Sequence, residues 1–246
     1  MKIALLSDIH ANLPAFEAAL KVLDSHQPDA VYCLGDLVGY NVWPNEIIAE
    51  IRRRGIATIA GNHDARVSQL TSTQLDEPGK NYGYKIIDTE NRSYLATLPA
   101  HIRIDHQLTV SPLSILLVHG SPDSNDEYLL EDKPEDEFLH TFRKAKADII
   151  CCGHSHKPYH RILSTLDENK NHFYHAINTG SVGKPKDGDT RGGFVMLTLH
   201  DFSSSKVAES IEVEFIRFEY EIERAAKAVE DSPLPNEFAD MLRKAY

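Results

Sequence analysis

The amino-terminal part of the chain alternates short apolar runs with amphipathic stretches. The runs at 2–6, 30–34 and 56–60 are continuously apolar, which predicts buried strands. The stretches at 13–26 and 44–55 place apolar residues three or four positions apart and carry a proline in their first turn, which predicts helices. Because strands and helices alternate, we expect an α/β fold.

The alternation breaks between residue 66 and about residue 106. Residues 71–81 are polar and typical of a loop, whereas residues 82–99 form one amphipathic stretch that ends at Pro99 and predicts a helix. We interpret residues 66–106 as a small helical cap inserted into a single domain that spans residues 1–246.

Beyond the cap the chain returns to short apolar runs. They predict strands at 107–110, 114–118, 148–152, 159–166, 172–177 and 192–199, and amphipathic stretches predict helices at 134–147, 221–230 and 235–246. The last predicted strand, 207–220, alternates regularly until Phe215 and then shifts phase at Ile216, which predicts a bulge or a twist.

Composition and charge narrow the classes of function. Hydrophobic residues make up 41% of the 246, enough for a core at this length, and the formal net charge of −11 argues against binding nucleic acid through bulk electrostatics. No leader is visible at the amino terminus, and no apolar run approaches the roughly 20 residues of a membrane helix. We therefore expect a soluble, cytoplasmic protein with no membrane partner.

The three cysteines, Cys33, Cys151 and Cys152, all lie in apolar runs. An odd number of cysteines argues against a disulfide framework. If residues 148–152 form a strand, the side chains of Cys151 and Cys152 face opposite sides of the sheet. We therefore expect all three to be buried packing residues rather than disulfide partners or zinc ligands.

Five of the predicted strands run into the same kind of polar ending. The side chains in these endings are of types that bind metals, and ligands of open α/β sheets bind beyond the carboxyl ends of the strands. Each ending alone is explained equally well by ordinary turn or cap chemistry, but five in order predict one shared metal site. The residues are Asp8 and His10; Asp36; Asn62, His63 and Asp64; His119; and His154 and His156.

The stretches SDIHAN, GDLVG, GNHD, VHG and GHSH, in this order, resemble the calcineurin-like metallophosphoesterase superfamily, and in particular its small bacterial single-domain members. The resemblance implies a four-layer α/β/β/α sandwich of two mixed sheets, with two metal ions at the strand ends. It implies that Asp8, His10, Asp36 and His156 hold one ion, and that Asp36, Asn62, His119 and His154 hold the other. Imidazole and oxygen ligands without thiolate favour manganese, iron, zinc, nickel or cobalt.

The activity implied by the resemblance is metal-dependent hydrolysis of phosphodiesters or nucleotides, with dinucleoside polyphosphates among the candidates. Hydroxide formed between the ions would attack phosphorus directly, and Asp36 would bridge the ions with one oxygen on each. His63 corresponds to the general acid of the family. We expect Asp64 to orient His63 and keep it protonated; the alternative is that Asp64 caps the following helix.

Further residues near these motifs are candidates for substrate contact: Asn12, Arg66, Ser181, Lys184 and Arg191. The glycine-rich stretch 179–193 either borders the site and contacts phosphate or a nucleotide, or forms a solvated hairpin. Tyr40 either stacks on a base or packs beneath the cap.

Rival functions remain within the same fold. A phosphomonoesterase of the protein phosphatase type is disfavoured, because no arginine follows the GD motif and His156 has no counterpart in those enzymes. A nuclease is disfavoured by the acidic charge. A non-catalytic scaffold resembling a retromer subunit is disfavoured because all seven ligand positions are filled. The expected partner is a small phosphorylated substrate, and the sequence does not define the oligomeric state.

Overall fold

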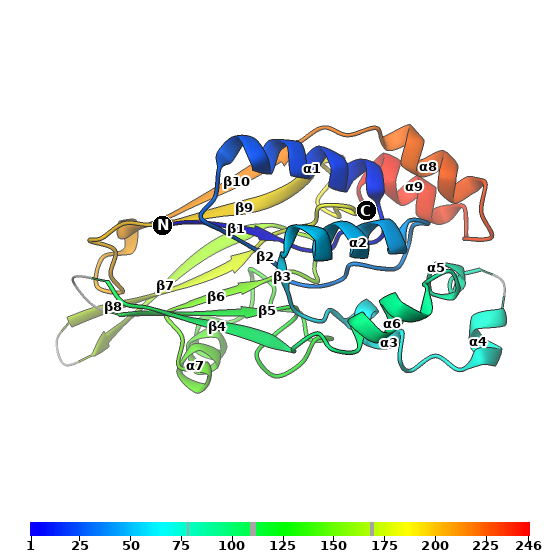
Figure 1. The fold of residues 1–246 in the computed structure, drawn as a ribbon. Coiled ribbons are helices and arrows are strands. Elements are labelled where there is room, and N and C mark those ends of the chain that lie inside the picture. The colour runs from blue at the N-terminus through cyan, green and yellow to red at the C-terminus, as the bar shows by residue number, and fades with distance from the viewer. Residues whose placement is uncertain (78, 109–111, 168–169) are drawn as a thin grey trace.

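The computed structural model describes residues 1–77, 79–108, 112–167 and 170–246. Two mixed β-sheets pack face to face and helices cover their outer faces (Figure 1). Helices α1 (Leu13–His26) and α2 (Pro44–Arg54) lie on the first sheet, and α7 (Glu135–Ala145) lies on the second. The predicted four-layer α/β/β/α sandwich is confirmed.

The first sheet has the order β10-β9-β1-β2-β3. Strands β1, β2 and β3 are parallel, whereas β9 and β10 run antiparallel to their neighbours, β1 and β9. The carboxyl ends of the three parallel strands therefore meet at one edge. The strands are β1 (Lys2–Leu6), β2 (Ala30–Cys33), β3 (Ala57–Thr58), β9 (Gly192–Leu199) and β10 (Ile211–Phe218).

The second sheet has the order β4-β5-β6-β8-β7. Strands β5, β6 and β8 are parallel, and the outer strands β4 and β7 are antiparallel to them. The ends of β5 and β6 thus lie side by side, next to the corresponding edge of the first sheet (Figure 1). The strands are β4 (His101–His106), β5 (Leu113–Val118), β6 (Ile149–Cys152), β7 (Tyr159–Asp167) and β8 (Lys170–Asn178).

Alternate residues of each strand enter different layers of the core. Leu5 of β1 and Cys151 of β6 pack between the two sheets, whereas Leu6 packs under the helices of the first sheet and Cys152 faces the α7 side. Cys151 and Cys152 thus face opposite sides, as predicted. All three cysteines are described, buried and free, with Cys33 in the layer under α1 and α2.

The phase shift in β10 has a cause other than a bulge. Strand β10 pairs with β9 in one continuous register from Ile211 to Phe218, so the expected bulge is wrong for these two fully described strands. Ile211 packs between the sheets, while Ile216 and Phe218 pack in the layer under the helices. The hydrophobic phase changes because the buried face of the strand changes along its length.

The cap consists of short helices joined by tight turns: α3 (Asn62–Arg66), α4 (Ser72–Asp76), α5 (Tyr82–Lys85) and α6 (Thr89–Leu95). The expected single helix over 82–99 is wrong. The backbone leaves the helix between α5 and α6, where the Asn45 side chain of α2 accepts a hydrogen bond from the Asp88 N–H at 2.9 Å.

The cap also ends earlier than expected, because His101–His106 forms β4. Of the strand expected at 107–110, residues 107 and 108 lie outside β4 and β5, and residues 109 and 110 lie outside the described residues.

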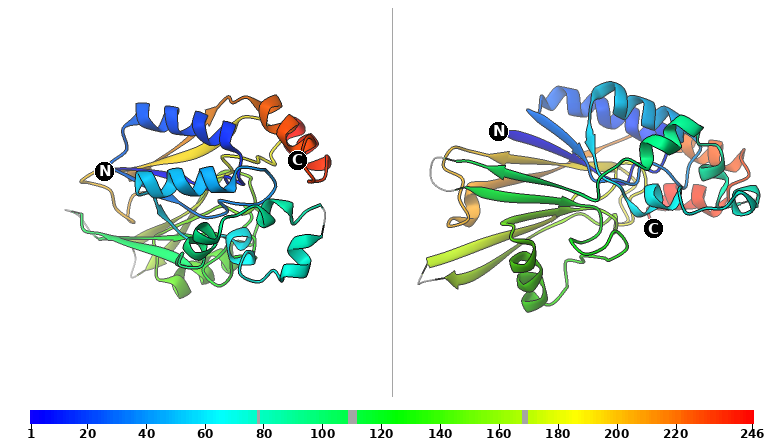
Figure 2. Two further views of the ribbon diagram at one scale, coloured as in Figure 1. Left: turned by 45° about the vertical axis from the view of Figure 1, so that its right-hand side comes forward. Right: turned by 60° about the horizontal axis from the view of Figure 1, so that its bottom comes forward.

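The chain ends in a short 3-10 turn, η1 (Ala208–Ser210), strand β10 and two helices, α8 (Ile222–Glu230) and α9 (Glu237–Lys244). Phe238 of α9 packs against Tyr40, which follows β2, with ring centroids 4.9 Å apart. Helices α8 and α9 and the cap lie at the same end of the molecule in both views of Figure 2. In the described ranges, no helix is long and apolar enough to cross a membrane.

Candidate metal centre

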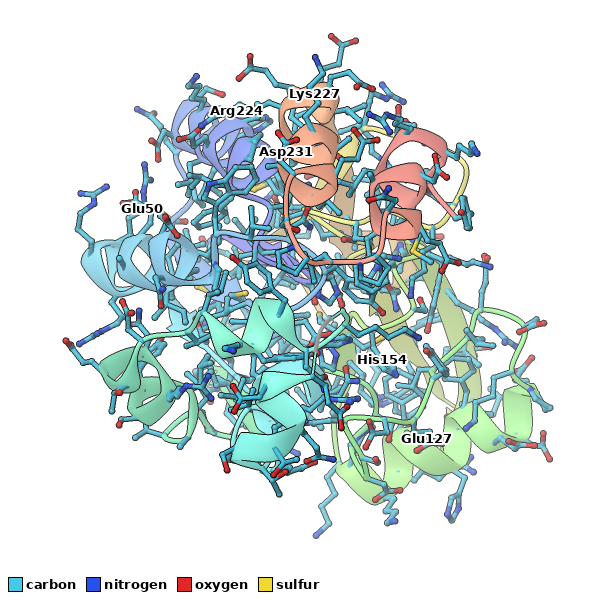
Figure 3. All side chains as sticks on the ribbon, turned by 90° about the vertical axis from the view of Figure 1, so that its right-hand side faces the viewer. Glu50, Glu127, His154, Arg224, Lys227 and Asp231 are labelled. Atoms are coloured by element: carbon cyan, nitrogen blue, oxygen red, sulfur yellow. The ribbon has the colours of Figure 1, made fainter. Side chains whose placement is uncertain are left out.

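The structure brings the predicted metal ligands together where the two sheets meet. One group of ligand atoms comes from Asp8, His10 and His156, and a second from Asp36, His119 and His154, with the atoms of each group within 4.8 Å of one another. All six residues are buried. In Figure 3, which faces this end of the molecule, His154 lies between the pair α8–α9 and helix α7.

The Asp8 carboxylate has one oxygen held by the protein and one directed at the centre. Its Oδ2 accepts hydrogen bonds from the Ser7 hydroxyl at 2.6 Å and from the His154 N–H at 3.0 Å. Its Oδ1 finds no hydrogen-bond partner in the described part of the chain and lies 3.1 Å from Nε2 of His156. A buried anionic oxygen without a donor is costly, and a cation at this point would satisfy it.

Asp36 divides its two oxygens in the same way. Oδ1 accepts a hydrogen bond from the His63 N–H at 2.9 Å. Oδ2 lies 3.6 Å from Nε2 of His10 and 3.4 Å from Nε2 of His119, so one oxygen faces both groups. We expected one Asp36 oxygen for each ion, but the geometry offers Oδ2 to both.

Three histidines are oriented by main-chain carbonyls. Nδ1 of His10 donates to Val38 O at 3.0 Å, Nδ1 of His119 donates to Leu34 O at 2.8 Å, and Nδ1 of His156 donates to Lys184 O. In each ring Nε2 is therefore the nitrogen offered to the centre, which is how metal-binding histidines are commonly held.

Two of these nitrogens face each other. Burial lowers the pKa of His10 and of His156, so neither Nε2 carries a proton at neutral pH. The two atoms are 3.1 Å apart, with lone pairs opposed. A cation between them would turn this repulsion into ligation.

His154 and Asn62 complete the second group differently. Nε2 of His154 lies 3.3 Å from Asp126 O, which leaves Nδ1 for the centre. Oδ1 of Asn62, at the start of α3, lies 3.1 Å from Nε2 of His119. Asn62 is half-buried, so this side of the centre is open towards the cap.

The backbone at the strand ends is unusual. Five of the seven predicted ligands have positive φ: Asp8 (54°), His10 (51°), Asp36 (57°), His154 (63°) and His156 (59°). Residues other than glycine rarely adopt this region, and where they do it commonly marks a functional site. Because the chain turns sharply at each strand end, ligands from separate strands can point inward together.

Two of the glycines that precede predicted ligands allow a close approach. A Cβ at Gly61 would lie 2.1 Å from Oδ1 of Asp36, and a Cβ at Gly153 would lie 2.5 Å from Oδ2 of Asp8. Any side chain at either position would displace a carboxylate. Glycine is therefore required here by the packing of the centre itself.

The electrostatics of the centre favour positive charge. Burial alone would raise the pKa of both carboxyl groups, but His156 beside Asp8 and His119 beside Asp36 hold both pKa values well below the usual range. Burial also opposes a proton on His119, yet the Asp36 carboxylate raises the pKa of His119 to about 10. The unmatched oxygen, the opposed nitrogens and this attraction for a cation show that the residues fit divalent metal ions.

The sequence was compared with known families once this geometry was established. The sequence model of the calcineurin-like phosphoesterase superfamily domain matches residues 1–201. The chain belongs to this superfamily. Membership agrees with the arrangement of the centre, because each of the matched motifs ends one of the strands that carry a ligand.

Individual relatives match over the whole chain. The protein MJ0912 of Methanocaldococcus jannaschii is 32% identical, with 98% of this chain and 96% of that protein covered. A metallophosphoesterase from Sphaerobacter thermophilus is 26% identical, with a TM-score of 0.77 over 100% of this chain and 99% of the other. The protein PH1004 of Pyrococcus horikoshii shares the fold, with 21% identity and a TM-score of 0.79 over 100% and 98% of the two chains.

The predicted pair of His63 and Asp64 is arranged differently from our expectation. The Asp64 carboxylate accepts hydrogen bonds from the N–H groups of Asp36 (2.7 Å), Leu37 (2.9 Å) and Gly61 (3.0 Å). Burial, followed by the charge of Asp36, raises the pKa of Asp64 to about 7. Asp64 therefore shapes the turn that carries Asp36 and does not orient the His63 ring.

The ring of His63 contacts the cap. Its Nδ1 forms a hydrogen bond with the Tyr84 hydroxyl, which comes from α5. A ring nitrogen of His63 lies within 4.8 Å of the ligand atoms of His10 and Asp36. Burial lowers the pKa of His63 to about 4.

Three of the predicted substrate contacts are placed elsewhere. Asn12 is buried, where its Oδ1 accepts from the Ala15 N–H at the start of α1 and its Nδ2 donates to Gly183 O. The buried Ser181 hydroxyl donates to Asp8 O at 2.8 Å. The exposed Arg191 pairs with Asp189 at 2.7 Å. These side chains serve the local fold, because a polar side chain in a turn finds its partners in the adjacent backbone.

The remaining two candidates lie at the centre. The Lys184 ammonium lies 4.6 Å from the centroid of the Tyr40 ring, and burial lowers the pKa of Lys184 to about 7. The guanidinium of Arg66 lies 5.8 Å from the centroid of the Tyr84 ring. Both remain predicted substrate contacts.

The stretch 179–193 is neither a rim nor a solvated hairpin over its first half. Residues 179–185 are buried, and the N–H groups of Val182 and Gly183 donate to Ser7 O and Asp8 O at 2.9 and 3.0 Å. This half braces the end of β1 from beneath. The second half, from Asp187 to Arg191, is the part that reaches solvent.

The sequence did not point to two residues at the centre. Tyr84 reaches His63 from a short helix, and Tyr128 stacks on His154 with ring centroids 4.2 Å apart. Both tyrosines lie outside the five motifs. The one available signal is that aromatic residues stand in polar, loop-like stretches, where no core requires them.

Proposed function

We propose that the chain is a phosphoesterase that depends on two metal ions and hydrolyses phosphodiesters or nucleotides, with dinucleoside polyphosphates among its candidate substrates. The observation that carries this proposal is the position of Asp36. Its Oδ2 lies between the groups that contain His10 and His119, at 3.6 and 3.4 Å from their Nε2 atoms. A shared carboxylate oxygen between two sets of ligands is suited to a pair of ions.

In this proposal Asp8, His10, Asp36 and His156 hold one ion, and Asp36, Asn62, His119 and His154 hold the other. When bound, such ions activate water and neutralise charge on phosphoryl oxygens. The protein positions the substrate phosphate between the centre and His63. The bond from phosphorus to the leaving oxygen breaks as the oxygen of water bonds to phosphorus.

His63 is proposed to donate to the leaving oxygen. Burial keeps its ring neutral at neutral pH, but an anionic phosphate beside the ring raises the pKa and favours the protonated form. The Tyr84 hydroxyl can donate to or accept from Nδ1, so it holds the ring in either state. Asp64 supports the reaction indirectly, because it fixes the backbone of Asp36.

Metal content and turnover together test the proposal. The purified chain is expected to contain divalent transition metal and to cleave bis-p-nitrophenyl phosphate faster than p-nitrophenyl phosphate, with activity lost to a chelator and restored by manganese. Asp36→Asn is expected to lower turnover by about 10³-fold or more, whereas Asp231→Asn, at the exposed end of α8 (Figure 3), leaves it unchanged. Full activity of metal-free protein would refute the proposal.

A further inference from the structure

A cavity beside the metal centre has no assigned role in the proposed function. It encloses about 370 Å³, within the size range of small-molecule sites. Its walls come from three separate parts of the chain: Tyr40 after β2, Lys80 and Tyr84 of the cap, and Phe238 of α9. His63 forms part of the same wall, so a group in this cavity lies next to the residue proposed to donate to the leaving oxygen.

Aromatic rings dominate the inner part of this cavity. The Tyr40 ring lies 4.9 Å from Phe238 and 4.9 Å from His63, centroid to centroid. Tyr84 stacks with His63 at 6.0 Å. Rings arranged in this way offer faces and edges to a flat aromatic ligand, and such stacking is the usual means of holding a nucleobase without reading its identity.

The charge around the cavity is positive, although the chain carries a formal net charge of −11. Arg66 and Lys80 line it, and the Lys184 ammonium lies 4.6 Å from the Tyr40 ring. Among the described residues that line the cavity, Glu237 is the single acid. Cations gathered on an acidic protein favour an anionic ligand.

Helix α9 supplies a wall that the shared domain does not. The match to the superfamily model ends at residue 201, whereas α9 begins at Glu237. The pair α8–α9 is held over the centre by a small apolar cluster that includes Val229 and Leu234, against which Tyr40 packs. The shape of this cavity is therefore set by a part of the chain outside the superfamily domain.

We propose that this cavity binds the leaving group of the substrate and that the leaving group is a nucleotide. The base stacks against Tyr40 and Phe238, and the phosphate of the leaving nucleotide contacts Lys80 and Arg66. On cleavage the leaving oxygen takes a proton from the His63 side, the oxygen of water bonds to phosphorus, and the remaining proton of water passes to solvent. This assignment rests on the proposed function for its direction, but its binding chemistry can be measured separately.

Calorimetric titration of the metal-free chain with ADP tests the assignment without turnover. ADP is expected to bind about 10-fold more tightly than either adenosine or inorganic pyrophosphate, because each of those carries only one of the two recognised groups. Equal binding of pyrophosphate and ADP would show that the rings are not used. Absence of ADP binding would overturn the proposal.

Two substitutions locate the binding in this cavity. Phe238→Leu keeps an apolar side chain in the cluster but removes the ring, and is expected to weaken ADP binding about 5- to 50-fold. Lys80→Ala changes an exposed residue and is expected to weaken it about 3- to 10-fold. The matched controls Phe202→Leu and Lys21→Ala, both at exposed positions, leave the affinity unchanged. ADP binding that neither Phe238→Leu nor Lys80→Ala weakens would place the nucleotide elsewhere.

The two proposals fail in distinguishable ways. If the unaltered chain cleaves bis-p-nitrophenyl phosphate with metal but does not bind ADP, the cavity assignment is wrong and the phosphoesterase stands. If ADP binds with the expected pattern and no ester is cleaved with any metal, the catalytic proposal is wrong and the nucleotide site stands.

Discussion

The contact between His63 and Tyr84 joins a residue of the metal motifs to a residue of the cap. In many hydrolases a carboxylate orients the equivalent imidazole, and we expected Asp64 to do so here. Asp64 is occupied by three main-chain N–H groups, so a neutral hydroxyl takes this place. The consequence is that the position of His63 depends on how the cap is folded.

Replacement of His63 tests its role as donor. His63→Asn is expected to lower the rate about 10²- to 10⁴-fold for a diester with a poor leaving group. The loss should be far smaller with p-nitrophenolate, which leaves without a proton. Steady-state rates with both substrates provide the comparison, and equal losses would exclude His63 as the donor.

Replacement of Tyr84 tests its effect on His63. Tyr84→Phe keeps the ring but removes the hydroxyl, and should lower the rate with a poor leaving group about 3- to 10-fold. In a His63→Asn background the same change should have no further effect, because its only route to the reaction is lost. Tyr82→Phe, on the same helix, is the control, and an additive double variant would contradict the prediction.

At the scale of elements, the sequence predicted what local patterns determine. Helix α1 and strands β1 and β9 have the predicted bounds, because each has a clear periodicity over its whole length. The cap was not predicted correctly, because α4, α5 and α6 are each too short for a reliable periodicity. The phase of β10 was misread because it depends on the twist of the sheet and on what covers each face.

The metal centre shows the same division. Its ligands could be found from the sequence, because each follows a strand directly and all face one edge. Tyr84, Tyr128 and the brace at 179–185 could not, because their contacts are set by how loops pack in three dimensions.

The turns at the strand ends predict the effect of a glycine substitution. Gly61→Ala places a methyl group 2.1 Å from Oδ1 of Asp36, so the carboxylate must move and metal binding should fall at least about 10-fold. Gly55→Ala is a matched control, because a Cβ there meets no atom of the described chain within 4 Å although φ is 65°. Bound metal per chain, measured by mass spectrometry, should separate the two. Equal metal content in both variants would contradict the prediction.

At the scale of the whole molecule, a pair of histidines away from the metal centre makes stability depend on pH. His175 is buried, and its Nδ1 lies 2.9 Å from Nε2 of His160. Burial, followed by the charge of His160, lowers the pKa of His175 from 6.5 to about 4. The unfolded chain therefore binds this proton more readily, and the stability contributed by the neutral ring is present above pH 6.5 and lost as the pH falls towards 4.

Urea unfolding of the metal-free chain measures this dependence. Between pH 6.5 and pH 5 the contribution of His175 should decrease by about 2 kcal/mol. His175→Gln should remove that part of the slope, whereas His140→Gln, at an exposed position on α7, should not. A pH dependence unchanged by His175→Gln would show that other groups determine it.

The positive φ angles of Asp8, His10, Asp36, His154 and His156 have a consequence for how this molecule could change over time. A left-handed conformation costs a residue other than glycine about 1–2 kcal/mol. A glycine at such a position would relax the backbone while removing a side chain that binds metal. Descendants that abandon catalysis would thus gain a sturdier scaffold, and natural drift in this architecture runs from working catalyst towards inert framework.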